Sequence, residues 1–152
     1  MPCVPSGASA GATVRIVLDT NVVISALLWR GPPYRVFQAA RQQDRLRLFT
    51  SPALIEELAE VLLRPGPTKR LALIGRTARQ VLTDYLEAVE LLDPPPLPAP
   101  ISRDPDDDAV LALAAAAKAD LIVSGDADLL VLDTHAGIPI RTPAQALSLI
   151  TG

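Results

Sequence analysis

A short apolar run that stops abruptly at an aspartate restricts the fold of this chain more than any other feature. Residues 15–18 (Arg-Ile-Val-Leu) are mostly apolar and β-branched, which predicts a strand buried on both faces. Thr20 or Asn21 can cap a helix that starts directly afterwards. Asp19 therefore stands where a buried strand gives way to a helix, and ligands bind at this edge of open α/β sheets. A carboxylate at such a place must be solvated, paired or bound to a cation.

Strands and helices are predicted to alternate along the whole chain. Further strands are expected at residues 46–49, 121–123 and 138–140, the last at a sheet edge because it contains Pro139. Helices are expected at residues 34–43, 52–63, 76–92, 105–117, 128–132 and from 143 onward, with at best a short helix at 69–74. Five prolines between Asp93 and Ser102 predict an extended connector, not a domain boundary. This alternation predicts an α/β fold with a central, mostly parallel sheet and helices on both faces.

Composition sets the size and setting of the domain. The 152 residues suffice for one domain, and 49% hydrophobic with only 3% aromatic residues predicts an aliphatic core. No apolar run approaches the roughly 20 residues of a membrane span, so no membrane association is expected. Residues 1–13 are expected to form a disordered N-terminal tail, which leaves residues 14–152 as the folded domain. The one cysteine, Cys3, lies in that tail and cannot form an internal disulfide, which fits a cytoplasmic location.

The two halves of the chain carry opposite charge. Residues 1–79 contain 11 Lys and Arg against 5 Asp and Glu, a net +6, whereas residues 80–152 contain 3 against 12, a net −9. A basic half beside an acidic half is a hint of nucleic-acid contact, although ordinary surface charge gives the same pattern. The candidates for phosphate contacts, which the sequence does not rank, are Arg15, Arg30, Arg35, Arg41, Arg45 and Arg47.

Two aspartates follow buried strands at equivalent places. Asp19 directly follows the first strand, and Asp126 comes shortly after the strand at residues 121–123. If both strands are central and parallel, the two carboxylates meet at one edge of the sheet. Each aspartate alone is adequately explained as a helix cap, but two at equivalent places favour a shared site.

Helical phase selects a glutamate as a third candidate. Leu54, Leu58 and neighbouring apolar residues define the buried face of the helix at residues 52–63. Glu56 lies about 160° from the centre of this face and is expected to be solvated, whereas Glu57 lies about 100° away. Glu57 thus stands at the border of the buried face, where it either points into a pocket or extends to the surface.

Four aspartates crowd the start of the helix at residues 105–117: Asp104, Asp106, Asp107 and Asp108. Acids are favourable at a helix N-terminus, but four in five residues exceed what capping uses, and they repel unless a cation is present. Asp107 lies about 60° from the centre of the apolar stripe of this helix, whereas Asp108 lies about 160° away. We therefore expect Asp107 to face the sheet and Asp108 to face water.

The chemistry of these residues predicts a metal site made of oxygen ligands. Four carboxylates without a Cys or His cluster suit Mg²⁺ or Mn²⁺ better than zinc, and the one histidine, His135, is expected at the ordinary surface. Two other classes of acidic site fit less well. A haloacid-dehalogenase-type phosphotransferase needs a second acid two residues after Asp19, where Asn21 stands. A phosphoacceptor receiver domain needs a lysine after a late strand, whereas Lys118 precedes its strand.

Four segments resemble the PIN-domain nuclease family, and within it the branch of toxins from bacterial toxin–antitoxin systems. They are Leu-Asp-Thr-Asn-Val-Val-Ile-Ser at residues 18–25, Ser-Pro-Ala-Leu-Ile-Glu-Glu-Leu at 51–58, Asp-Pro-Asp-Asp-Asp at 104–108 and Val-Ser-Gly-Asp-Ala-Asp-Leu-Leu at 123–130. The segments occur in the order and spacing of the family, and the likeness covers residues 14–150. Ser124 stands where the family often has threonine, which keeps a hydroxyl at that place.

The resemblance implies a three-layer α/β/α sandwich and a metal-dependent endoribonuclease. It implies metal ligands and catalytic residues at Asp19, Glu57, Asp107 and Asp126, with Asp128 as an auxiliary acid and Thr20, Asn21 and Ser124 ordering the pocket. Metal ions at such a site make hydroxide available near neutral pH and neutralise charge on the transition state. The implied partners are RNA, a cognate antitoxin and a second copy of the chain. The alternatives are a catalytically silent module that binds RNA or protein and, less favoured, an acidic-site phosphatase.

Overall fold

The computed structural model describes residues 13–151, so the predicted tail lies outside the described residues except for Thr13. The elements are, in chain order, β1 (Val14–Leu18), α1 (Thr20–Leu28), α2 (Pro32–Gln42), β2 (Leu46–Thr50), α3 (Pro52–Leu62), α4 (Pro65–Ile74), α5 (Ala78–Ala88), β3 (Val89–Leu91), α6 (Pro105–Ala117), β4 (Leu121–Val123), α7 (Ala127–Leu130), β5 (Thr134–His135), β6 (Ile138–Arg141) and α8 (Pro143–Thr151). Within residues 13–151, no helix is long and apolar enough to cross a membrane.

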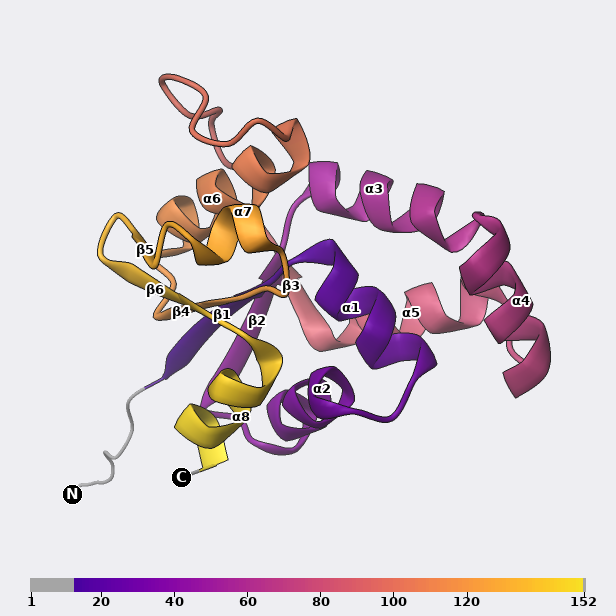
Figure 1. The fold of residues 1–152 in the computed structure, drawn as a ribbon. Helices are drawn as coiled ribbons and strands as arrows, with labels where there is room; N and C mark the ends of the chain where they lie inside the picture. Colours follow the sequence, from indigo (N-terminus) through magenta and orange to yellow (C-terminus); the bar gives the residue numbers. More distant parts are fainter. Residues whose placement is uncertain (1–12, 152) are drawn as a thin grey trace.

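The strands form a six-stranded sheet in the order β3-β2-β1-β4-β6-β5 (Figure 1). Every neighbouring pair is parallel except β5 with β6, so the predicted α/β fold with a mostly parallel sheet is confirmed. The chain proceeds from β1 to β2 on one side and later returns to β4 on the other. The order of the strands therefore reverses at β1 and β4, which creates a crevice at their carboxyl ends.

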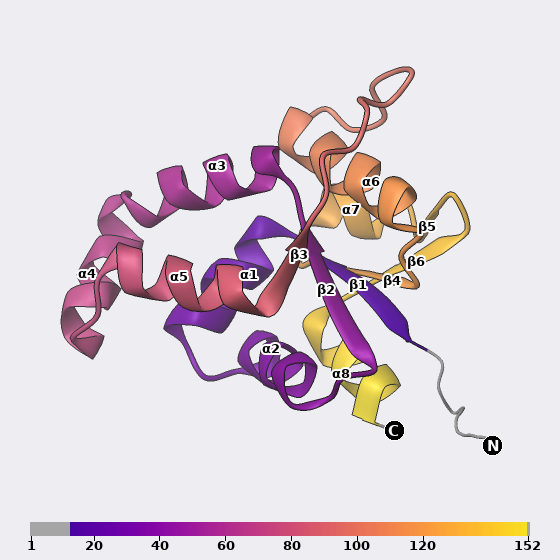
Figure 2. The same cartoon turned by 180° about the vertical axis from the view of Figure 1, so that it is seen from behind.

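Helices cover both faces of the sheet, as Figures 1 and 2 show from opposite sides. Alternate residues of β1 face opposite ways: Ile16 and Leu18 pack in one hydrophobic cluster, with residues of α1, α2, α5 and α8, whereas Val17 packs in the other, with residues of α6. The core is almost entirely aliphatic, as expected from the composition. This packing fixes β1 between two layers of helices.

Several predicted elements were wrong in type or position. The helix expected at residues 76–92 ends at Ala88, and the next three residues form β3, which pairs in parallel with β2. Pairing with β2 overrides the helical pattern there, a long-range effect that local periodicity does not contain. Where at best a short helix was expected at residues 69–74, α4 begins at Pro65, which takes the first helical position, and runs to Ile74. The strand containing Pro139 is not the sheet edge, because β5 pairs outside it.

Candidate metal centre

Three aspartates from separate parts of the chain meet at the carboxyl ends of β1 and β4. Asp19 follows β1, Asp107 lies in the first turn of α6, and Asp126 lies just before α7. Each offers a carboxylate oxygen within 4.8 Å of the others, and we call this group the aspartate cluster. Asp19 and Asp107 are only 6% and 3% exposed, and Asp126 is half-buried. The parallel pairing of β1 with β4, in which Leu18 faces Val123, brings two of these residues together.

Ser124 connects the two aspartates that follow strands. Its hydroxyl donates to Oδ2 of Asp19 at 2.8 Å and accepts the backbone N–H of Asp126 at 2.9 Å. Asp19 occupies the N-cap position of α1, so the expectation that Thr20 or Asn21 caps this helix was wrong. Its side chain makes no capping hydrogen bond and is turned into the site instead. Asp126, by contrast, also caps α7, because Oδ1 accepts the backbone N–H of Asp128 at 2.9 Å.

The connector before α6 supplies a second serine to the cluster. Ser102 donates its hydroxyl to Oδ2 of Asp107 at 3.0 Å. Asp108 accepts the backbone N–H of Ser102 at 2.8 Å and that of Ile101 at 3.2 Å. The expectation that Asp108 faces water was therefore wrong: it is half-buried and anchors the connector. Helical phase correctly placed the Asp108 side chain on the side of α6 away from the sheet. It did not reveal that the connector folds back over that side of the helix.

Glu57 lies beside the aspartate cluster but outside the group of three. It is half-buried in α3, and its Oε1 accepts the hydroxyl of Thr20, a residue of α1. It also contacts Asp106, an exposed acid of the same run as Asp107. Sequence reasoning gave no role to Asp106 or to Ser102, because neither lies on a buried helical face.

Burial and crowding make these carboxyl groups harder to ionise. Burial raises the pKa of Asp19, and the hydrogen bond from Ser124 partly offsets this effect. Burial, together with the charge of Asp126, raises the pKa of Asp107 to about 7, against the hydrogen bond from Ser102. Burial and a hydrogen bond with Asp106 raise the pKa of Glu57 to about 7. Three convergent carboxylates without a neighbouring cation are electrostatically costly, and a divalent cation removes that cost.

The donor atoms of the cluster fit Mg²⁺ or Mn²⁺. All are carboxylate oxygens, which these hard cations prefer, and two serine hydroxyls fix the orientation of two of the carboxylates. Within residues 13–151, no lysine or arginine forms an ion pair with the cluster. Arg103, which is 87% exposed, pairs at 3.1 Å with Asp128, two residues after Asp126.

Several arginines that the sequence offered as phosphate contacts are instead used for structure. Arg15 donates to the carbonyl of Ala117, and Arg47 pairs with Glu90. Both lie near the amino ends of β1 and β2, whereas the aspartate cluster lies at the carboxyl ends. Arg45 donates to the carbonyl of Ile150. These three residues therefore do not border the candidate site, and Arg103 is a cation that does.

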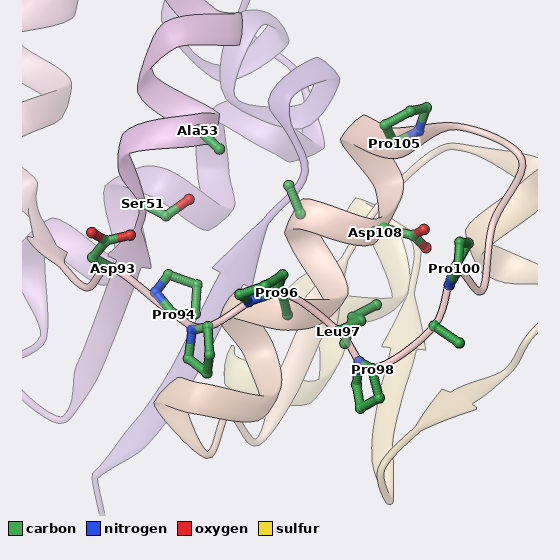
Figure 3. A pocket seen from close by; sticks show the side chains of 14 residues that line it. Ser51, Ala53, Asp93, Pro94, Pro96, Leu97, Pro98, Pro100, Pro105 and Asp108 are labelled. Atoms are coloured by element: carbon green, nitrogen blue, oxygen red, sulfur yellow. The ribbon is translucent and has the colours of Figure 1, made fainter.

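A separate pocket of about 420 Å³ lies under the proline-rich connector (Figure 3). The rings of Pro94 and Pro96 lie along one wall, and the start of α6 forms another. None of its lining residues belongs to the aspartate cluster. Asp108 lines this pocket, so the pocket and the cluster lie on adjacent sides of α6.

The comparisons with known proteins agree with this architecture. The model of the PIN domain family matches residues 15–128, so the chain belongs to that family. The uncharacterized protein MJ1680 of Methanocaldococcus jannaschii is 31% identical over 120 residues, which are 78% of this chain and 75% of that protein. A chain in the crystal structure of VapBC2 from Rickettsia felis, bound to a DNA fragment from its promoter, has a similar fold. It superposes with a TM-score of 0.57 and 12% identity, over 85% of this chain and 98% of that one.

Proposed function

We propose that this chain is a metal-dependent endoribonuclease that hydrolyses RNA phosphodiester bonds with Mg²⁺ or Mn²⁺. The observation that carries the proposal is the aspartate cluster: three convergent carboxylates, two of them buried, at the carboxyl edge of a PIN-domain sheet. RNA as the substrate comes from the family resemblance. The proposed site of action is the cytoplasm.

Each acid has a distinct proposed role. Asp19, Asp107 and Asp126 would hold the cation, which when bound supplies Lewis acidity and positive charge at the phosphodiester. Glu57 lies outside this group, which favours a role in orienting the attacking water over a role as a ligand. A carboxyl with a pKa of about 7 accepts and releases a proton readily near neutral pH, as such a role requires. Thr20 would hold Glu57, as its hydroxyl donates to Oε1.

Residues around the cluster order it. Ser124 would keep one oxygen of Asp19 turned toward the shared edge, which leaves the other available to the cation. Asp128 would serve as an auxiliary acid that keeps Arg103 beside the site, where this guanidinium can meet a substrate phosphate. Asn21 lines, together with Asp126, a hollow beside the aspartate cluster.

The most direct test is cleavage of RNA with Mn²⁺ present and after its removal with EDTA. Wild-type protein should cleave only with the metal, and Glu57→Gln should lose at least about 100-fold in rate, because the proton acceptor is removed. Glu56→Gln is the matched control, since Glu56 is the exposed neighbour on the same helix and should retain the wild-type rate. Binding of RNA without cleavage would favour the silent binding module. Hydrolysis of p-nitrophenyl phosphate without RNA cleavage would favour the phosphatase.

We further propose that the chain is the toxin of a toxin–antitoxin pair and forms a homodimer. The protein with a similar fold is part of a VapBC2 complex, and unregulated RNA cleavage would harm the host cell. Leu63 at the end of α3 and Leu73 in α4 are 75% and 74% exposed, which suits a surface covered by another chain. Co-expression with a small protein encoded beside it should give a complex in which RNA cleavage is suppressed. Light scattering that finds only monomers would contradict the homodimer.

A further inference from the structure

A hollow of about 520 Å³ opens directly beside the aspartate cluster, and Asp126 belongs to both. Its walls come from α1, from the first turns of α2 and α8, and from the loop after β4. These helices lie next to one another on the same side of the sheet (Figure 1).

The polar groups in the hollow are uncommitted. Asn21 and Ser25 are four residues apart, hence one turn apart on the same face of α1. Thr20 already donates to Glu57, whereas within residues 13–151 neither the Asn21 amide nor the Ser25 hydroxyl has a hydrogen-bond partner. The amide can donate and accept, and the hydroxyl can do both as well. The hollow therefore offers two adjacent hydrogen-bonding groups to a ligand.

The remaining walls are apolar or negatively charged. Pro33 and Pro143 line the hollow with apolar rings, and Asp126 is its one charged lining residue. Without a lining lysine or arginine, and with a carboxylate at its edge, the hollow disfavours a phosphate. A neutral, flat group with apolar faces and polar edges suits it, and an unstacked nucleobase has these properties.

We propose that this hollow receives the nucleobase next to the phosphodiester that is cut at the aspartate cluster. This proposal rests on the proposed ribonuclease function. Asn21 and Ser25 contact the edge of the base, and the proline rings contact its face. Cleavage is then selective for the base at one position flanking the cut. Selectivity arises because a base with the wrong edge leaves these polar groups without partners.

Gly125 provides a way to fill the hollow without disturbing the fold. It lines the hollow, is exposed, and a Cβ built on it meets no atom within 4 Å. Its φ lies outside the left-handed region, so a side chain there is not strained. Gly66, in α4, has the same open surroundings and is not a lining residue, so Gly66→Leu is the matched control for Gly125→Leu.

The first experiment maps cleavage sites in an RNA library with random sequence, using Mn²⁺ and the full chain. Wild type should prefer one base at one flanking position by roughly 10-fold, the discrimination that a hydrogen-bonded base contact supplies. Ser25→Ala should reduce this preference several-fold, and Gly125→Leu should lower kcat/KM at least about 10-fold. Ser25→Ala and Gly125→Leu should both keep the wild-type increase of Tm with Mn²⁺. Gly66→Leu should match wild type in base preference, in kcat/KM and in this increase of Tm. Equal cleavage beside all four bases, or an unchanged preference in Ser25→Ala, would overturn the proposal.

A second experiment does not depend on activity. Metal-free protein is titrated with the uncharged nucleosides adenosine, guanosine, cytidine and uridine, and amide resonances are followed by NMR. The resonances of Ser25 and Gly125 should shift with at least one nucleoside, and Gly125→Leu should abolish the shifts. If wild type cleaves no RNA but these shifts occur, the ribonuclease proposal fails and the base site stands. If RNA is cleaved but no nucleoside shifts these resonances, the base site fails alone.

Discussion

Replacing Asp107 or its neighbour Asp108 with asparagine should change the stability of the metal-free protein in opposite directions. Asp107 is 3% exposed and lies among other carboxylates, whereas Asp108 accepts two backbone N–H groups of the connector. Asp107→Asn removes a buried charge from a repulsive group, and its amide oxygen can still accept the Ser102 hydroxyl. Asp108→Asn keeps an acceptor but loses the charge that strengthens its hydrogen bonds.

The magnitude for Asp107 follows from its pKa. Burial and the charge of Asp126 raise this pKa from 3.8 to about 7 in the folded protein. Between about pH 4 and pH 7 the folded protein keeps a proton on Asp107 that the unfolded chain has lost. The contribution of Asp107 to the free energy of unfolding therefore falls as pH rises through this range, and it is constant above about pH 7. At about 1.36 kcal/mol per pKa unit, the upper limit is on the order of 4 kcal/mol. Allowing for local relaxation, we expect Asp107→Asn to gain roughly 1–3 kcal/mol at pH 8, or about 2–10 °C in Tm.

The effect of Asp108→Asn is smaller and has the other sign. Weakening two charge-assisted hydrogen bonds and a favourable contact with the N-terminus of α6 should cost about 0.5–1.5 kcal/mol. In RNA cleavage, Asp107→Asn should lose at least about 100-fold in rate because it disturbs the proposed cation site. Asp108→Asn should retain most of the activity, because the connector keeps its anchor.

Thermal unfolding in EDTA at pH 4 and pH 8, with cleavage assays in Mn²⁺, measures these effects. The gain in Asp107→Asn should be present at pH 8 and absent at pH 4. A Tm of Asp107→Asn below that of wild type at pH 8 would refute the argument from burial and repulsion. Equal loss of activity in both variants would show that Asp108 acts at the site as well.

Three further predictions concern the same group of acids. Asp19→Asn should abolish RNA cleavage, while its circular dichroism spectrum stays native and its Tm in EDTA is unchanged or raised; a variant that cleaves at the wild-type rate would remove Asp19 from the site. Millimolar Mn²⁺ should raise the Tm of wild type, because a metal concentration of 100 times Kd adds about 2.7 kcal/mol to the free energy of unfolding. The rise in Tm should be smaller in Asp126→Asn, and no rise in wild type would argue against a metal site. Because the carboxyl groups of Glu57 and Asp107 have a pKa of about 7, the apparent Mn²⁺ affinity should increase from pH 6 to pH 8 with release of protons. Calorimetry in buffers of different ionisation enthalpy measures that release, and a pH-independent affinity would contradict it.

The sequence determined the features that depend on local patterns. The period of apolar residues predicted most helices. Ser51 and Asp104, each followed by a proline, cap α3 and α6. Helical phase distinguished buried Asp107 from Asp108, because the direction of a side chain around a helix follows from its number alone. The position of Asp19 at the end of a buried strand likewise followed from the chemistry of residues 15–19.

Only the tertiary structure decided which groups touch across long stretches of chain. The hydrogen bond between Ser124 and Asp19 spans 105 residues and exists because β1 pairs with β4. Asp108 anchors the connector because the connector folds back over α6 and donates two backbone N–H groups to its carboxylate. Helical phase gives the direction in which Asp108 points, but not which residues lie there. Glu57 stands beside the aspartate cluster, not within it, because α3 follows β2, on the side of β1 away from β4. Such contacts depend on the order of strands in the sheet, which hydrophobic periodicity does not encode.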